Sequence, residues 1–288
     1  MDSEQIRLDQ RIVVLKPNIN RSFAQHLINS GKIEVNGKII TKSSFKVSSN
    51  DNITVNIDPN ETKIPDIDIP IVFEDENCVV INKPVGILVH SKGPFNHEAT
   101  VASWLKQKNN IDDFGKTSKE QLNDRNGIVH RLDRGTSGVM ICAKNQKTLK
   151  YLQKQFSNRK VTKKYIAIVH GNPPQNHAII DMPIERNPKK PQTFRVGSNG
   201  KKAITEFKLI KRSKVFSLLE LIPETGRTHQ LRVHLSNLGM PIVGDTLYGG
   251  PESDRLYLHS RSLKINIPGN IVKTFEAEIP KSFDRLLS

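Results

Sequence analysis

The first 57 residues combine a helical period with a strand period. Apolar residues at i, i+4 and i+7 from Leu8 predict a short amphipathic helix. A second helix is expected in "RSFAQHLINSG", with Ser22 as its N-cap. "IEVNGKII" predicts a hairpin that turns at Asn36-Gly37, and "NITVNI" predicts a strand. Two helices and a small sheet make a compact module that presents a surface and has little room for a pocket.

The pattern changes after residues 58–70, whose three prolines and several acidic residues predict a linker. Beyond it, apolar runs predict strands in "CVVI", "VMICAK", "KKYIAIVHG", "KAITEFKLI" and "FSLLELI". Helices are expected in "TVASWLKQ" and around Leu152, and residues 107–126 are expected to form a polar loop. We therefore predict an α+β fold, in which residues 71–288 form a largely antiparallel mixed sheet with flanking helices and residues 1–57 form a small α/β domain.

Charge narrows the range of partners. The chain has a net charge of +15, and the acidic residues dominate only in residues 58–76. This excess favours a polyanionic partner, either nucleic acid or an anionic membrane surface. The sequence has no apolar run near 18 residues and no signal peptide pattern, so we expect a cytoplasmic protein without a membrane span. Cys78 and Cys142 lie in apolar surroundings and are expected to be reduced core residues.

Several familiar catalytic motifs are incomplete. "DFG" at 113–115 and the later "HRLD" stand in the reverse of the protein kinase order, and no glycine-rich loop is present. "GKT" at 115–117 lacks the first glycine of a P-loop, because Asn110 is there. His229 and His234 are five residues apart and do not share a helix face as a metal-binding pair would. We therefore expect no nucleotide, metal or other cofactor.

The stretch "HRLDRGTSGV" at 130–139 places Asp133 among cationic and small residues. A carboxylate can act as a covalent nucleophile if it stays ionised and is held rigidly. A nearby guanidinium lowers an aspartate pKa by about 1–3 units and keeps the group charged. "GRTHQLRVHL" predicts a helix capped by Thr228, from which Arg232 can reach inward. The buried stripe of that helix is expected to contain Leu231, Leu235 and Leu238.

Two other interpretations of Asp133 stay open from the residues alone. A surface ion pair with Arg131 or Arg134 is the ordinary explanation for such a spacing. A glycosidase would need a second carboxylate, and the candidates have no motif around them. These candidates are Glu220, Glu224 and Asp245.

Two resemblances then account for most of the chain. "RLDQRI", "NRSFAQHLINSGKIEVNGK" and "SSNDNITV" resemble the S4 RNA-binding domain. "NKPVG" (82–86), "HRLDRGTSG" (130–138), "KKYIAIVHG" (163–171) and "GRTHQLRVHL" (226–235), in this order, resemble the RluA-type pseudouridine synthases. "SKGPFNHE" and residues 107–126 depart from that pattern and put substrate contacts in doubt.

The resemblance implies a reaction without cofactor or metal. Such enzymes break the N-glycosidic bond of a uridine in RNA, rotate the uracil and rejoin it through carbon. Asp133 would be the nucleophile, attacking either sugar or base, and Arg232 would pair with it. Tyr165 would stack on the target base and assist proton removal. Arg131 would fill the space left by the flipped uridine, and Leu231 would close the pocket.

The S4 likeness implies further RNA contacts. Within the N-terminal domain the expected RNA-facing residues are Arg21, Ser22, Gln25 and Lys32. Near the catalytic centre the expected substrate contacts also include Thr136, Arg227 and His229. We expect residues 1–57 to be the S4-like domain, 58–70 the linker and 71–288 the catalytic domain.

The expected substrate is large-subunit ribosomal RNA, and transfer RNA stays open. A non-catalytic RNA-binding factor on the same fold is the rival hypothesis, and a hydrolase releasing a base or sugar is a third. A monomer is the default expectation.

Overall fold

The computed structural model describes residues 5–16, 19, 21–56, 65–90, 98–109 and 127–286. They form two compact units. The first holds the described residues up to 67 together with 90 and 98–104, and the second holds residues 68–89, 105–109 and 127–286. Most of "SKGPFNHE" and of the expected loop at 107–126 lies outside the described residues. Residues 107–109, which were expected in that loop, belong to helix α3 (Val101–Asn109).

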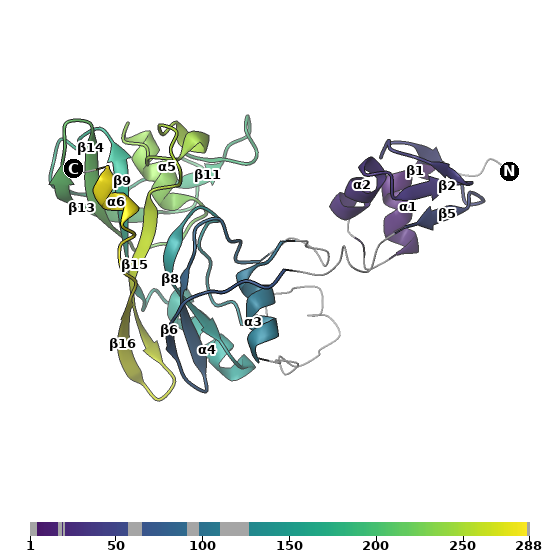
Figure 1. Ribbon diagram of the computed structural model, residues 1–288. Helices are drawn as coiled ribbons and strands as arrows, with labels where there is room; N and C mark the ends of the chain where they lie inside the picture. Colours follow the sequence, from purple (N-terminus) through teal and green to yellow (C-terminus); the bar gives the residue numbers. More distant parts are fainter. Residues whose placement is uncertain are drawn as a thin grey trace. The chain divides into compact units, whose positions relative to one another are not determined.

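The N-terminal unit packs two helices against short strands (Figure 1). Its elements are β1 (Ile6–Arg7), α1 (Leu8–Leu15), α2 (Arg21–Asn29), β2 (Ile33–Val35), β3 (Lys38–Ile39), β4 (Lys46–Val47) and β5 (Ile53–Val55). Strand β2 pairs with β3 and β5, and the hairpin turns at Asn36 and Gly37, which both have positive φ. The predicted helices and hairpin are confirmed. The N-cap was wrong, because α2 already begins at Arg21 and Ser22 lies inside its first turn.

The larger unit is built on a nine-stranded sheet of the described residues. Its strands are β6 (Ile71–Glu74), β7 (Cys78–Lys83), β8 (Ser137–Ala143), β9 (Thr162–His170), β10 (His177–Asp181), β13 (Ile204–Arg212), β14 (Phe216–Pro223), β15 (Leu258–Ile267) and β16 (Ile271–Glu276). The order is β10-β13-β14-β9-β15-β8-β7-β6, and β16 pairs with β15. Only the pairing of β15 with β8 is parallel in this described sheet, so the predicted largely antiparallel α+β architecture is confirmed.

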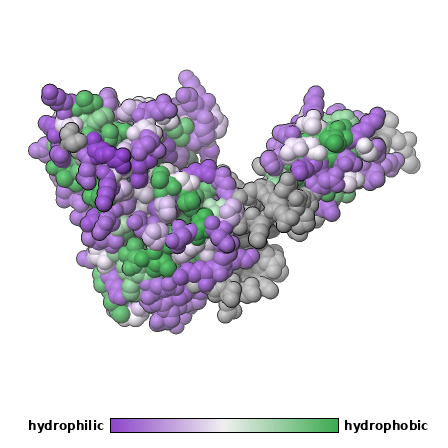
Figure 2. All heavy atoms as spheres, viewed as in Figure 1, coloured by the Kyte–Doolittle hydropathy of each residue, from purple (hydrophilic) through white to green (hydrophobic). Residues whose placement is uncertain are grey.

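Helices and a separate hairpin flank this sheet (Figure 1). They are α4 (Gln146–Ser157), the β11 (Ile184–Arg186) and β12 (Phe194–Val196) hairpin, α5 (Gln230–Asn237), the 3-10 helix η2 (Thr246–Tyr248) and α6 (Ser282–Arg285). No helix of the described residues is long and apolar enough to cross a membrane. Figure 2 shows hydrophilic residues over much of the visible surface.

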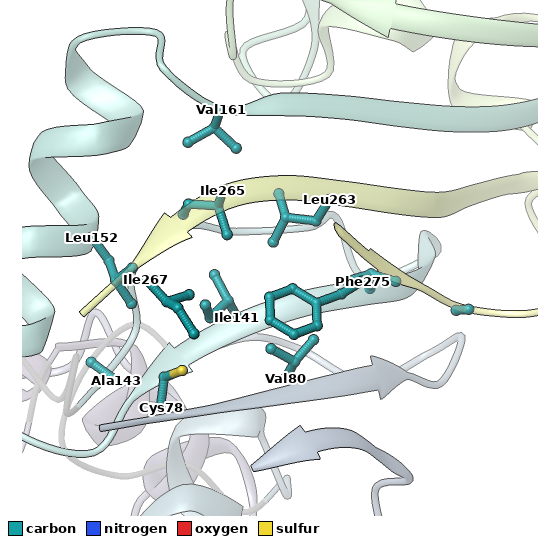
Figure 3. Packing of buried hydrophobic residues seen from close by; sticks show 12 residues of the cluster. Cys78, Val80, Ile141, Ala143, Leu152, Val161, Leu263, Ile265, Ile267 and Phe275 are labelled. Carbon is teal, nitrogen blue, oxygen red and sulfur yellow. The ribbon is translucent and has the colours of Figure 1, made fainter. Parts of the chain in front are cut away.

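Strands β7 and β8 form the middle of the core. Almost all of their residues are buried, which explains why their sequences are continuous apolar runs. One cluster joins these strands to α4, β15 and β16 through Val80, Ile141, Leu152, Ile265 and Phe275 (Figure 3). Cys78 and Cys142 are buried free thiols, as predicted, and burial raises the pKa of each to about 12.

The sheet register places the start of β8 level with the middle of β9, with β15 between the two strands. Gly138 on β8 lies opposite Ser260 on β15, and Ser260 lies opposite Tyr165 on β9. Gly138 has φ 112°, and a Cβ there would collide with the Ser260 backbone. The chain therefore brings the loop before β8, which contains Asp133, close to Tyr165.

Candidate active site

The loop that carries Asp133 is held at both sides. Its backbone forms a β-turn in which Thr136 N–H donates to the Asp133 carbonyl at 3.0 Å. Next to the turn, Gly86 N–H donates to the Arg134 carbonyl at 2.9 Å, and Arg134 Nε donates to the Gly86 carbonyl at 3.0 Å. The Asp133 side chain keeps 28% of its surface exposed. A fixed loop thus presents a carboxylate that solvent and substrate can reach.

Lys83 lies behind this loop and is completely buried. Its ammonium group donates to the carbonyls of Pro84 at 2.8 Å, Ile87 at 2.9 Å and Arg134 at 3.3 Å. Burial lowers the pKa of Lys83 to about 8, while the negative charge of Asp133 opposes that shift. Lys83 therefore joins the "NKPVG" turn to the aspartate loop. It was absent from the predicted site residues, although it lies in the "NKPVG" stretch that carried the resemblance.

Arg232 comes from α5 and bridges two carboxylates. Its Nη1 lies 3.4 Å from Asp133 Oδ2, while its Nε and Nη2 both lie 2.7 Å from the carboxylate oxygens of Asp245. The Tyr248 ring lies under the guanidinium, 4.9 Å from ring centroid to Cζ. Despite burial, the pKa of Arg232 is raised, because Asp245 and Asp133 both favour the charged form. The geometry gives Arg232 a second and shorter partner, the buried Asp245, which sequence reasoning considered only as a glycosidase carboxylate.

Helix α5 begins and ends differently from the prediction. The N-cap is His229, with φ 55° in the left-handed region, and the helix starts at Gln230, so the expected cap at Thr228 was wrong. Leu231 and Leu235 are buried as expected, whereas Leu238 is the C-cap and is 38% exposed. The left-handed turn at His229 directs its side chain toward the loop of Asp133, whose Oδ1 lies 4.0 Å from His229 Nε2.

His229 is connected to the β11–β12 hairpin through Tyr248. Its Nδ1 lies 2.8 Å from the Tyr248 hydroxyl, and that oxygen accepts a hydrogen bond from Phe194 N–H at 2.9 Å. Burial lowers the pKa of His229 and Arg232 adds to this effect, while the charge of Asp133 opposes it. His229 was predicted only as a substrate contact. The structure places it beside the Asp133 carboxylate.

Tyr165 is buried on β9, where its side chain is 9% exposed. Burial raises its pKa to about 12, a hydrogen bond with Ser260 opposes the shift, and the charge of Asp133 adds to it. At neutral pH the hydroxyl is therefore protonated and is a weak base. The position of Tyr165 near Asp133 suits a residue that contacts the target base. Its raised pKa makes it a poor base for removing a proton in the ground state.

The remaining predicted catalytic-domain contacts have different environments. Thr136 is buried and takes part in the Asp133 turn through its backbone. Arg131 is exposed. Arg227 donates from Nε to the carbonyl of Lys202 at 3.0 Å. These positions hold the loop or lie at the surface, and the structure gives none of them a described contact with the Asp133 carboxylate.

In the N-terminal unit, two of the predicted RNA contacts bind a buried aspartate. Arg21 Nε lies 3.0 Å and Gln25 Nε2 2.7 Å from Asp9 Oδ2, and Arg7 donates to both oxygens at 3.0 Å. Lys32 is partly exposed, and the Ser22 side chain lies outside what the structure describes. Arg21 keeps 52% of its side chain exposed, so its bond to Asp9 leaves surface for a phosphate.

Comparisons with known proteins assign the chain to a family. The family model for RNA pseudouridylate synthase matches residues 77–237, and the S4 domain model matches residues 6–53. The chain therefore belongs to the RNA pseudouridine synthase family, as an RluA-type member with an N-terminal S4 domain. It is an isomerase that forms pseudouridine in RNA, and the S4 domain binds RNA. The rival non-catalytic and hydrolase interpretations were wrong.

Relatives with known names agree with this assignment. "Ribosomal large subunit pseudouridine synthase D" of Borreliella burgdorferi is 41% identical over 88% of this chain and 80% of that protein. An uncharacterised RNA pseudouridine synthase of Bacillus subtilis is 34% identical over 98% of this chain and 93% of that protein. The solved structure of human RNA Pseudouridylate Synthase Domain Containing 1 has a TM-score of 0.61 and 27% identity, covering 77% of this chain and 86% of that one.

Proposed function

We propose that this protein converts specific uridines of large-subunit ribosomal RNA to pseudouridine, with Asp133 as the nucleophile. The observation that supports Asp133 as the nucleophile is that its carboxylate is held in place but has few hydrogen bonds. Its carboxylate is partly exposed, its loop is held by Lys83 and Gly86, and Arg232 contacts one oxygen at 3.4 Å. Such a group is held rigidly, yet keeps lone pairs free for attack.

The other residues of the site have proposed roles in supporting the attack by Asp133. Arg232 stabilises the charge of Asp133 from the side of Oδ2, and Asp245 fixes the guanidinium. Tyr165 contacts the flipped base, Leu231 closes the pocket beside it, and Arg131 occupies the vacated space in the RNA. Extrusion of the uridine costs a few kcal/mol, which contacts to the RNA backbone and to the flipped base offset.

Ribosomal RNA is preferred because relatives at 33–41% identity are named for the large ribosomal subunit. We further propose that residues 1–57 bind structured RNA, 58–70 form a linker and 71–288 carry out the reaction. Arg21, Ser22, Gln25 and Lys32 are proposed RNA contacts of the first domain, and Thr136, Arg227 and His229 of the second. We place the protein in the cytoplasm, where such RNA is available and buried thiols stay reduced.

The test is to incubate the protein with unmodified ribosomal RNA and, separately, with bulk transfer RNA. Pseudouridine is mapped by carbodiimide-dependent reverse-transcription stops, with Asp133→Asn as the matched variant. We expect stops at discrete uridines of large-subunit RNA that vanish in the variant. Stops in transfer RNA alone would overturn the ribosomal substrate, and stops made equally by Asp133→Asn would overturn the nucleophile.

A further inference from the structure

His229 stands at the centre of a chain of polar groups that runs from the β11–β12 hairpin to Asp133. The groups follow one another as Phe194 N–H, the Tyr248 hydroxyl, the two ring nitrogens of His229 and Asp133 Oδ1. The separations are 2.9 Å, 2.8 Å and 4.0 Å. The first two are hydrogen bonds. The last, from His229 Nε2 to Asp133 Oδ1, exceeds hydrogen-bond distance by about 1 Å.

The direction of these hydrogen bonds can be deduced from the available protons. A backbone N–H can only donate, so Phe194 uses one lone pair of the Tyr248 oxygen. The phenol then has its own proton to give, and His229 Nδ1 is the ring nitrogen that faces it at 2.8 Å. Burial raises the pKa of Tyr248 and lowers that of His229, so at neutral pH the phenol is protonated and the imidazole is neutral. Nδ1 is therefore the acceptor, and the ring proton is on Nε2.

We infer that His229 is a positioning residue for Asp133, with Tyr248 and the Phe194 backbone fixing its Nε2–H tautomer so that this proton points at Oδ1. This inference rests on the proposed role of Asp133 as nucleophile. The two carboxylate oxygens then have one donor each, Arg232 at Oδ2 and His229 at Oδ1. The 4.0 Å gap closes when the target uridine is bound, as hydrogen bonds in an empty active site commonly shorten in the complex.

The backbone at His229 supports a function for this side chain. A non-glycine residue with φ 55° is strained, and such residues persist where the surrounding structure maintains them. The ring is also held from the sides, since Phe194 and Tyr248 both make edge contacts with it, at 5.7 Å and 5.5 Å between centroids. Its rotation is therefore restricted, and Nε2 stays directed at Asp133.

A pH effect follows from the charged groups around His229. Asp133 and Asp245 favour its protonation, whereas Arg232, burial and the Tyr248 proton at Nδ1 oppose it. In Tyr248→Phe the hydroxyl that donates to Nδ1 is lost. Nδ1 is then free to bind a proton from solvent, which raises the pKa of His229. The resulting imidazolium would pair with Asp133 and occupy the lone pairs needed for attack.

The test reads the proton directly in the full-length protein. Nitrogen-15 NMR of labelled histidines reports which ring nitrogens are protonated, and His229 is assigned with His229→Asn, since asparagine tolerates a left-handed backbone. We expect an unprotonated Nδ1 in the wild type. In Tyr248→Phe, which keeps the ring under Arg232, we expect the proton to spread over both nitrogens and the imidazolium to appear at higher pH. A protonated Nδ1 in the wild type, or an unchanged spectrum in Tyr248→Phe, would overturn the tautomer assignment.

Kinetics then test the role. At saturating RNA stem-loop, Tyr248→Phe and His229→Asn should each lower kcat about tenfold, as expected for one lost hydrogen bond. KM should stay unchanged in Tyr248→Phe, which leaves the proposed RNA contact of His229 in place. The acidic limb of kcat should move to higher pH in Tyr248→Phe. The control is Tyr257→Phe, which removes a buried hydroxyl that binds Asp254 at 2.9 Å and should leave kcat unchanged.

Unchanged kcat in both site variants would overturn the positioning role. The proposed function fails by a different result, activity in Asp133→Asn, and the NMR spectrum is read without reference to that activity.

Discussion

The tripeptide Arg-Leu-Asp occurs at residues 7–9 and again at 131–133, and its two aspartates have opposite environments. Asp9 is fully buried and accepts four hydrogen bonds of 2.7–3.0 Å from Arg7, Arg21 and Gln25. Asp133 is 28% exposed and accepts, from the part of the chain that the structure describes, one bond of 3.4 Å, which comes from Arg232. The same local sequence therefore yields one saturated carboxylate and one that keeps free lone pairs.

The two aspartates differ because Arg7 offers two nitrogens to Asp9, whereas Arg232 offers one to Asp133. In the N-terminal unit, Arg7 binds Asp9 through two nitrogens, and both partners lie at the start of α1. In the larger unit, Asp245 takes the two-nitrogen contact with Arg232 and leaves one nitrogen for Asp133. Both aspartates are beside cations, so a cation alone does not identify a nucleophile. The number of hydrogen bonds and the exposure of the carboxylate distinguish Asp133 from Asp9 and support the proposed nucleophile.

The largest expected effect separates the two aspartates by activity. Asp133→Asn should lower the rate on an RNA stem-loop by at least about 10³-fold, because an amide cannot replace a carboxylate nucleophile. Its melting temperature should stay close to that of the wild type, since the two described contacts of the side chain, with Arg232 at 3.4 Å and His229 at 4.0 Å, are both long. Single-turnover pseudouridine formation and calorimetry measure both quantities. A large loss of stability in Asp133→Asn would instead make Asp133 a structural residue like Asp9.

The next effect concerns how Arg232 is shared. Asp245→Asn removes the charge that holds Nε and Nη2, so Arg232 is free to bind Asp133 with two nitrogens. We expect kcat to fall by about 10–100-fold, the equivalent of one or two charge-assisted hydrogen bonds, with little change in KM. Asp245→Glu should recover part of this loss. Equal kcat in Asp245→Asn and the wild type would show that the guanidinium needs no second carboxylate.

A smaller effect is expected at Asp9, and on stability instead of chemistry. Asp9→Asn should destabilise the N-terminal unit by about 1–2 kcal/mol, because the amide has no negative charge to pair with Arg7 and Arg21 and offers one acceptor oxygen in place of two. Faster amide hydrogen exchange in residues 21–56, with an unchanged rate on a short stem-loop, is the expected result. A rate loss like that of Asp133→Asn would contradict the comparison.

The smallest effect is a pH dependence. The guanidinium groups of Arg7 and Arg21 hold the pKa of Asp9 well below its usual value, with burial opposing them. A lowered pKa adds stability that is complete above the unfolded value, near pH 4, and disappears as the pH falls further. Exchange in the N-terminal unit should therefore accelerate between pH 4 and pH 2 in the wild type and less in Asp9→Asn. Parallel curves for the two proteins would contradict this account.

Much of the fold was predictable from periodicity. The strands β7, β8, β9, β13 and β14 and the helices α1, α2 and α4 all follow from runs of apolar residues, and the mixed, mostly antiparallel sheet follows from their density. The two-stranded β11–β12 hairpin gave no such signal, because residues such as Glu185 and Arg195 interrupt the apolar pattern. Its place depends on contacts with α5 and Tyr248.

The site was predictable only in part, for a related reason. Asp133, Tyr165 and Arg232 lie in motifs with a recognisable order. Asp245 contacts Arg232 13 positions away and Lys83 contacts Arg134 51 positions away, and no local pattern reports either contact. The cap of α5 was misassigned because Thr228 is a common N-cap residue, whereas a left-handed His229 requires the support of Tyr248 and Phe194.

The position of β15 in the sheet has a consequence for the order of folding. This strand, Leu258–Ile267, lies between β8 and β9, and Ser260 and His259 bind Val139 and Ser137 across 121 and 122 positions of sequence. Contacts of such separation form late, because a long chain segment must be closed before they stabilise anything. Until residues near 260 have emerged, a growing chain on the ribosome thus lacks the strand that joins the start of β8 to the part of β9 that carries Tyr165. We therefore expect no activity from a nascent chain until the segment of β15 has left the ribosome.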